Sequence, residues 1–226
     1  MKYLKVLGLA ALAAMVVMAF GAGSASATTK ICVSTPGTTD NECPANKSEP
    51  DPNNPQADIH VEGRLTNPPG AVLVTNITTV ICEESGVTLT ANGSTPETGA
   101  TSITGEVTSL SFAKCKTSAG VPCTITVLNL PYESHLQGTI EGVTNTSSLT
   151  VTDPVGAGAK VVCGLVLNCT FTTKEATLHG KNITTPTTAE FTASNLPLEK
   201  AGGLCPATAE WNASYEVTTP SGFTVH

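Results

Sequence analysis

The stretch that decides the fold reads Ala207-Thr208-Ala209-Glu210-Trp211-Asn212-Ala213-Ser214-Tyr215-Glu216-Val217-Thr218. Apolar residues occupy every second position, and polar residues fill the positions between them. Successive side chains of a strand point to opposite faces, so this alternation predicts a half-exposed antiparallel strand. Trp211, the only tryptophan of the chain, falls on the apolar face. We expect it to anchor the core beside Cys205; the alternative is a platform for a ligand.

The same pattern extends over most of the chain. The 226 residues include 37 threonines, and between Ala57 and Thr219 these alternate with Val, Ile and Leu. β-branched residues at a period of two indicate strands, and turn signals such as Asn92-Gly93 and Asp153-Pro154 separate them. No segment combines a helical period with caps. We therefore predict an all-β domain over residues 58–220, an antiparallel β-sandwich or jelly-roll-like domain of roughly ten short strands.

Two irregularities modify this pattern. The apolar parity switches between Val107 and Leu110, which predicts a bulge near Thr108-Ser109 or a strand that crosses between sheets. In addition, Asn129-Leu130-Pro131 is echoed by Asn195-Leu196-Pro197. Because proline interrupts a ladder, we expect both segments to turn a corner at a sheet edge, in equivalent positions of two pseudo-symmetric halves.

The amino-terminal residues have the pattern of an export signal. Lys2 and Lys5 precede an apolar run that ends near Phe20, and Ala25 and Ala27 follow it. We predict a signal peptide of bacterial appearance over residues 1–27, cleaved before Thr28; the alternative is an uncleaved membrane anchor. The mature chain would then be secreted or associated with the cell surface, with no membrane span.

Residues 28–57 are rich in Thr, Pro, Asn, Asp and Ser, which predicts a flexible arm, and residues 221–226 form a short tail. The formal charge of the chain is −7, and loss of residues 1–27 removes two lysines and no acids, giving −9. Nucleic acid is therefore a disfavoured partner, because phosphate binding needs clustered Lys and Arg.

All eight cysteines follow residue 27, and an even number in an exported chain predicts disulfides. A metal site is disfavoured because no C-x-x-C occurs and the four histidines are scattered singly. Eight cysteines allow many connectivities, and we favour sequence neighbours, with one long bond closing the domain. The predicted bonds are Cys32–Cys43, Cys115–Cys123, Cys163–Cys169 and Cys82–Cys205.

No catalytic motif is present: the sequence lacks a nucleophile elbow, a metalloprotease motif and nucleotide-binding glycine loops. Glu83-Glu84 is the only adjacent acidic pair, and we expect two solvated surface acids there. We therefore predict no catalytic residues, no metal and no cofactor. A hydrolase would require His135 or His179 to meet Glu and Ser in a pocket, and a protease inhibitor would present an exposed loop such as Lys116–Pro122.

Four segments carry a family resemblance. They are Cys82 with Gly86–Thr90, Ile103–Phe112 running into Cys115, Cys123–Thr126 leading to Asn129–Tyr132, and Cys205–Trp211 leading to Tyr215–Pro220. These segments resemble a group of uncharacterised exported, cysteine-containing all-β proteins of actinobacterial type, over residues 80–220. The order Cys, Asn-Leu-Pro-aromatic, Cys is also similar to the secreted "protein activator of alkane oxidation" family, which is associated with cell surfaces and biofilm. The resemblance implies the fold and export, and it implies no activity or catalytic residues.

These features together favour an exported structural or binding module at the cell surface or in the extracellular matrix. Cell-wall, polysaccharide or matrix components are the partners we expect. The alternative is a secreted hydrolase or protease inhibitor.

Overall fold

The computed structural model describes residues 29, 31–33, 59–66, 70–91, 102–138, 146–165, 167–184, 187–200 and 205–225. Strands joined by turns make up these ranges, and no helix occurs in them. The described chain accordingly has no helix long and apolar enough to cross a membrane. The all-β prediction is confirmed, whereas the predicted signal peptide over residues 1–27 lies outside the described residues.

Twelve strands lie within the described ranges. In chain order they are β1 (Ile31–Val33), β2 (Ile59–Leu65), β3 (Ala71–Thr75), β4 (Thr79–Ala91), β5 (Ile103–Thr117), β6 (Pro122–Leu128), β7 (Tyr132–Gly138), β8 (Thr146–Cys163), β9 (Leu167–Thr184), β10 (Thr187–Lys200), β11 (Thr208–Thr219) and β12 (Phe223–Val225).

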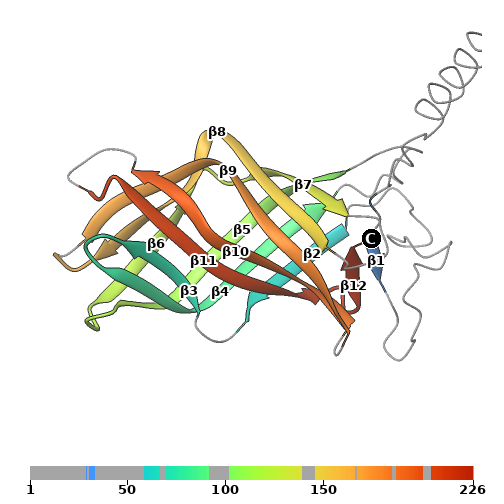
Figure 1. Ribbon diagram of the computed structural model, residues 1–226, viewed down its shortest axis with the longest axis horizontal. Helices are drawn as coiled ribbons and strands as arrows, with labels where there is room; N and C mark the ends of the chain where they lie inside the picture. The colour runs from blue at the N-terminus through green and yellow to red at the C-terminus, as the bar shows by residue number, and fades with distance from the viewer. Residues whose placement is uncertain are drawn as a thin grey trace, which may run out of the picture.

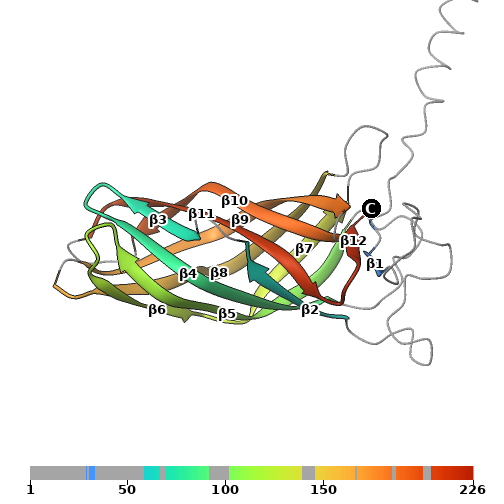
Figure 2. The same cartoon turned by 90° about the horizontal axis from the view of Figure 1, so that it is seen from below.

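Strands β2 to β11 form one antiparallel sheet that closes into a barrel of eight strand positions (Figures 1 and 2). Around the barrel, β4 pairs with β5, β5 pairs with both β6 and β7, and these two both pair with β8. Strands β8, β9, β10 and β11 then follow in order. Strands β2 and β3 share the last position, because each pairs with β11 on one side and β4 on the other.

The barrel replaces the predicted sandwich or jelly roll, and the reason lies in the length of the strands. Strands β8 and β9 contain 18 residues each, whereas short strands separated by turns were expected. Asp153-Pro154, which we predicted as a turn, lies inside β8 at a register shift between Thr152 and Ala157. The Asp153 carboxylate accepts hydrogen bonds from the backbone N–H groups of Val155 and Gly156, at 2.7 and 3.2 Å. The strand therefore bends and continues, which lets the sheet curl until its edges meet.

The alternation predicted for β11 is confirmed. Ala209, Ala213, Tyr215 and Val217 are buried inside the barrel, and the residues between them are half-buried or exposed. This strand lies between β10 and the position shared by β2 and β3, so one of its faces lines the interior.

The bulge predicted near Thr108-Ser109 is also confirmed. Thr88 of β4 faces Ser109, but its neighbour Leu89 faces Val107, so Thr108 is the extra residue of β5. The extra residue allows Val107 and Leu110 to line the interior together, although their numbers have opposite parity.

The asparagines of the two echoed segments adopt the same backbone conformation, although the Leu130–Pro131 peptide bond is cis and the Leu196–Pro197 bond is not. Asn129 follows β6 and Asn195 sits at a register shift of β10, and both have a positive φ, of 64° and 51°. Asparagine is one of the few residues that enters this left-handed region readily. Both segments lie within the closed wall, since β6 and β7 lie between β5 and β8, and β10 lies between β9 and β11. They therefore do not mark a free sheet edge.

Three disulfides occur in the described chain, and their connectivity corrects the prediction. They are Cys82–Cys115, Cys123–Cys163 and Cys169–Cys205. The predicted bonds Cys115–Cys123, Cys163–Cys169 and Cys82–Cys205 are wrong. The predicted bond Cys32–Cys43 falls partly outside the described residues, because Cys43 is not among them.

The reason for the error is visible in the register of β5. Cys115 lies opposite Cys123 across the β5–β6 ladder, as a hairpin requires, but it also lies opposite Cys82 of β4. The bond is made to Cys82, 33 residues away in sequence. The sequence could predict that the β5–β6 hairpin brings Cys115 close to Cys123. It could not predict that Cys115 bonds to Cys82, because that depends on the pairing of β4 with β5 in the closed barrel.

Strands β1 and β12 form a separate antiparallel pair at one end of the barrel, near the chain's C-terminus (Figure 1). Strand β1 falls within residues 28–57, expected to be an arm, and β12 falls within the expected tail 221–226. Ile31, Phe223 and Val225 are each at most 5% exposed. Both stretches thus contribute a strand to the fold, and the side chains of Ile31, Phe223 and Val225 are buried.

Candidate functional site

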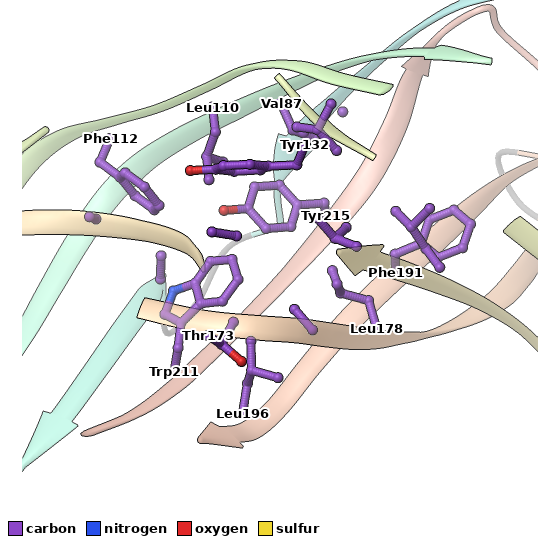
Figure 3. A pocket seen from close by; sticks show the side chains of 18 of the residues that line it. Val87, Leu110, Phe112, Tyr132, Thr173, Leu178, Phe191, Leu196, Trp211 and Tyr215 are labelled. Atoms are coloured by element: carbon purple, nitrogen blue, oxygen red, sulfur yellow. The ribbon is translucent and has the colours of Figure 1, made fainter. Parts of the chain in front are cut away.

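The inward faces of the strands leave a cavity of about 180 Å³ inside the barrel. Every Phe, Tyr and Trp side chain beyond residue 27 lines this cavity. These residues are Phe112, Tyr132, Phe171, Phe191, Trp211, Tyr215 and Phe223. In Figure 3, Phe112, Tyr132, Tyr215 and Trp211 gather around one part of the cavity, while Phe191 lies at the other side with Leu178. The aromatic content of the domain is therefore concentrated on a single internal space.

The aromatic side chains pack against one another at the wall. The Phe112 and Trp211 rings lie edge to face, with centroids 6.2 Å apart and an interplanar angle of 77°. The Trp211 and Tyr215 rings are tilted by 53° at the same centroid distance. Trp211 thus packs against the core as we expected, and it also lines the cavity, the position required of a ligand platform.

The cavity wall contains no charged side chain among the described residues, and its tyrosine hydroxyls are hydrogen-bonded within the protein. Ser85 donates to the backbone oxygen of Ser111 at 2.7 Å, and its hydroxyl lies 2.8 Å from that of Tyr215. Since Ser85 has one hydrogen and gives it to Ser111, Tyr215 is the donor of the second bond. Burial raises the pKa of Tyr215 above its usual value, against a smaller lowering by the Ser85 bond. The phenol is therefore neutral at physiological pH.

Tyr132 is likewise hydrogen-bonded within the protein and has a raised pKa. Its hydroxyl donates to the backbone oxygen of Leu128, and it lies 3.2 Å from both the backbone nitrogen and the backbone oxygen of Gly158. Burial is the main cause that raises the pKa of Tyr132, and the negative charge of Asp153 adds to it. Both tyrosines thus present neutral rings to the cavity and direct their hydroxyls to protein partners.

The two ends of the barrel are built differently. Six cysteines lie at the end drawn on the left in Figure 1, because they flank or face the β5–β6 turn, the β8–β9 turn and the β10–β11 connection. The other end is covered by β12, whose Phe223 is 1% exposed and reaches the cavity. The Asn182 side chain holds this strand through the backbone of Val225, donating at 2.8 Å and accepting at 3.1 Å. Among the described residues, three disulfides thus hold one end, and the Asn182 side chain holds β12 at the other.

The histidines considered for a hydrolase lie outside this cavity. His135 of β7 is 3.3 Å from Glu133 on the outer surface and is opposite Thr150 in register. His179 of β9 is exposed and opposite Ser148. Within the described ranges, no group of three or more His, Cys, Asp or Glu side chains is arranged to hold a metal ion. The structure therefore brings neither His135 nor His179 to the cavity.

The other two surface features also have plain structural roles. Glu83 pairs with Lys116 at 2.6 Å and Glu84 pairs with Lys114, and all four side chains are about half exposed. The hydrogen bond from Lys116 is the main cause that lowers the pKa of Glu83. Lys116–Pro122 is a tight turn between β5 and β6, closed by the Thr117 N–H, which donates to the Val121 oxygen at 2.8 Å.

The functional feature that sequence reasoning missed is the cavity itself. Of its aromatic residues, only Trp211 was considered as a possible contact to a ligand. A usable signal was present, because Phe171 and Phe191 share the parity of buried neighbours such as Cys169 and Ala193. Parity shows which side chains face inward, but it does not show how much space they leave.

An antiparallel barrel of eight strand positions with an apolar internal cavity is the class of protein that the fold and the site define. No family model, curated protein or solved structure matches the chain.

Proposed function

We propose that the protein is an exported binding module that holds one small, neutral, apolar molecule inside its barrel. The observation that carries this proposal is the cavity of about 180 Å³, lined by all seven aromatic side chains that follow residue 27. Protein interiors are normally close-packed, and an eight-stranded barrel either fills with side chains or holds one small ligand. The cavity is space that the inward side chains leave unfilled, which supports a barrel that holds one small ligand.

The size of the cavity limits the size of the ligand. An engineered apolar cavity of about 150 Å³ takes up benzene or xenon. The slightly larger cavity here therefore suits a single six-membered ring with one or two small substituents. Larger ligands would require the wall or β12 to move.

The lining limits the charge of the ligand. No described lining residue is charged, and both lining phenols stay neutral because burial raises their pKa values. An ion moved from water into such a site would lose its hydration without gaining a counter-charge. A neutral ligand is therefore favoured over a carboxylate, an amine or a phosphate.

The setting of the proposed function is outside the cytoplasm. Three disulfides indicate an oxidising environment, as in extracellular proteins. The export signal predicted for residues 1–27 agrees with this. We propose that the protein acts in the extracellular space or at the cell surface, where it would take up small apolar molecules from water.

A titration with two matched probes tests this function. The oxidised, exported protein is titrated with toluene and with benzoate, which share a ring and differ in charge. Binding is followed by calorimetry and by the fluorescence of Trp211, the only tryptophan and a lining residue. We expect saturable one-site binding of toluene and no binding of benzoate.

Two substitutions localise the site. Ala176→Leu fills the cavity from β9 and should abolish toluene binding, because Ala176 lines it. Ala113→Leu adds the same atoms to an exposed position on β5 and should leave binding unchanged. Failure of toluene and of other one-ring hydrocarbons to bind at all would refute the proposed function.

A further inference from the structure

Of the four described side chains that line the cavity and can donate a hydrogen bond, three already donate within the protein. Tyr215 donates to Ser85, and Tyr132 donates to a backbone carbonyl. Thr173 donates to the backbone oxygen of Glu175 at 2.6 Å. Each hydroxyl carries one hydrogen, so none of the three keeps a donor for a ligand.

The fourth donor is the indole N–H of Trp211, which makes no hydrogen bond to any residue of the described chain. Trp211 is partly buried, and its side chain packs against the core and lines the cavity. Within the described residues, Ser147 Oγ is the one fully covered side-chain polar atom without a partner, so the indole nitrogen is not fully covered by protein atoms. Trp211 is opposite Leu73 of β3 and Leu196 of β10, whose side chains also line the cavity.

We propose that the Trp211 indole N–H is the polar contact of the ligand, and that the ligand is a neutral one-ring molecule with one hydrogen-bond acceptor, such as a carbonyl or ether oxygen. This inference rests on the proposed function, because it concerns the same cavity. It narrows the ligand class from any small hydrocarbon to an acceptor-bearing ring.

The surroundings of Trp211 support this class. Its ring lies edge to face with Phe112 and tilted against Tyr215, so packing restricts the orientation of the indole in the wall. One free donor on an otherwise apolar wall matches one acceptor on an otherwise apolar ligand. A second acceptor would be left without a partner on this wall, which disfavours ligands that carry several polar groups.

A matched pair of probes separates the hydrogen bond from the shape of the ligand. Acetophenone and α-methylstyrene are both planar one-ring molecules that differ by an oxygen in place of a CH₂ group. Because the chain has a single tryptophan, the indole N–H gives one resonance in a nitrogen–proton correlation spectrum. We expect acetophenone to move this resonance clearly downfield, and α-methylstyrene to move it little.

Substitution of the donor gives the second measurement. Trp211→Phe should weaken acetophenone binding about threefold to tenfold more than it weakens α-methylstyrene binding, as measured by calorimetry. The control is Phe191→Leu, which changes a lining side chain that has no polar atom. It should change the affinity for both probes by the same factor, because it alters shape alone.

The outcomes distinguish the two proposals. If neither probe binds the wild-type protein, the proposed function fails and the inference fails with it. If both probes bind but shift the indole resonance equally, and Trp211→Phe weakens both equally, the function stands and this inference is overturned. The spectroscopic measurement uses the wild-type protein, so it holds even where Trp211→Phe does not fold.

Discussion

Filling the cavity should stabilise the protein, and the substitution Ala176→Leu tests this. At about 24 cal/mol per Å³, an empty cavity of 180 Å³ costs the folded state about 4 kcal/mol. Ala176 is 7% exposed and lines the cavity from β9. Leucine adds three carbons there, and at about 0.8 kcal/mol for each buried CH₂ the gain is about 2 kcal/mol.

The assay is unfolding by denaturant and by heat, with disulfides intact. A gain of about 2 kcal/mol should raise the melting temperature by about 4–8 °C for a chain of this size. Ala113→Leu, on the exposed face of β5, is the control and should change stability by less than about 0.5 kcal/mol. If Ala176→Leu instead destabilises the protein by about 1–3 kcal/mol, the typical result of overpacking, the interior has no room and the reasoning is refuted.

Three further predictions concern the wall and its polar groups. Replacing Cys123 and Cys163 together by Ala should cost about 4 kcal/mol, given their separation of 40 residues, and peptide mapping should recover this pair; a bond from Cys123 to any other cysteine would contradict the structure. Ser147→Ala should stabilise the protein by about 1 kcal/mol in denaturant unfolding, because it removes a buried hydroxyl without a partner; a loss of stability would show that the hydroxyl is bonded. The pKa of Tyr215 is raised in the folded state. The contribution of Tyr215 to the free energy of unfolding is therefore complete below about pH 10, the pKa of an unfolded tyrosine, and falls by at most about 1.4 kcal/mol per pH unit above it. Tyr215→Phe should flatten this alkaline loss of stability, and equal slopes for both proteins would contradict the assignment.

Local features of the fold could be predicted because they depend on periodicity. The alternation in β11 and the extra residue at Thr108 are both encoded by neighbouring residues, and the structure contains both. The bend at Asp153 was misread as a turn because the same residues suit either. Nothing local distinguishes a chain that reverses from a strand that bends and continues.

Closure of the sheet and the disulfide pairing could not be predicted because they depend on distant partners. Cys115 has a neighbouring cysteine on each side, and only the β4–β5 ladder makes Cys82 available to it. The cavity could not be predicted either. The alternation along the strands identifies Phe171 and Phe191 as buried, but it does not show how closely their side chains pack. The volume that remains depends on the diameter of the barrel, which is set by the number of strands that close it.

The central claim is that the barrel holds a small apolar ligand in an internal cavity. A crystal structure of the oxidised protein, equilibrated with toluene or with xenon under pressure, tests it most directly. The structure predicts density for one guest molecule inside the barrel, between Phe112, Phe191 and Trp211. A barrel whose inward side chains interdigitate, with no guest density among them, would contradict it.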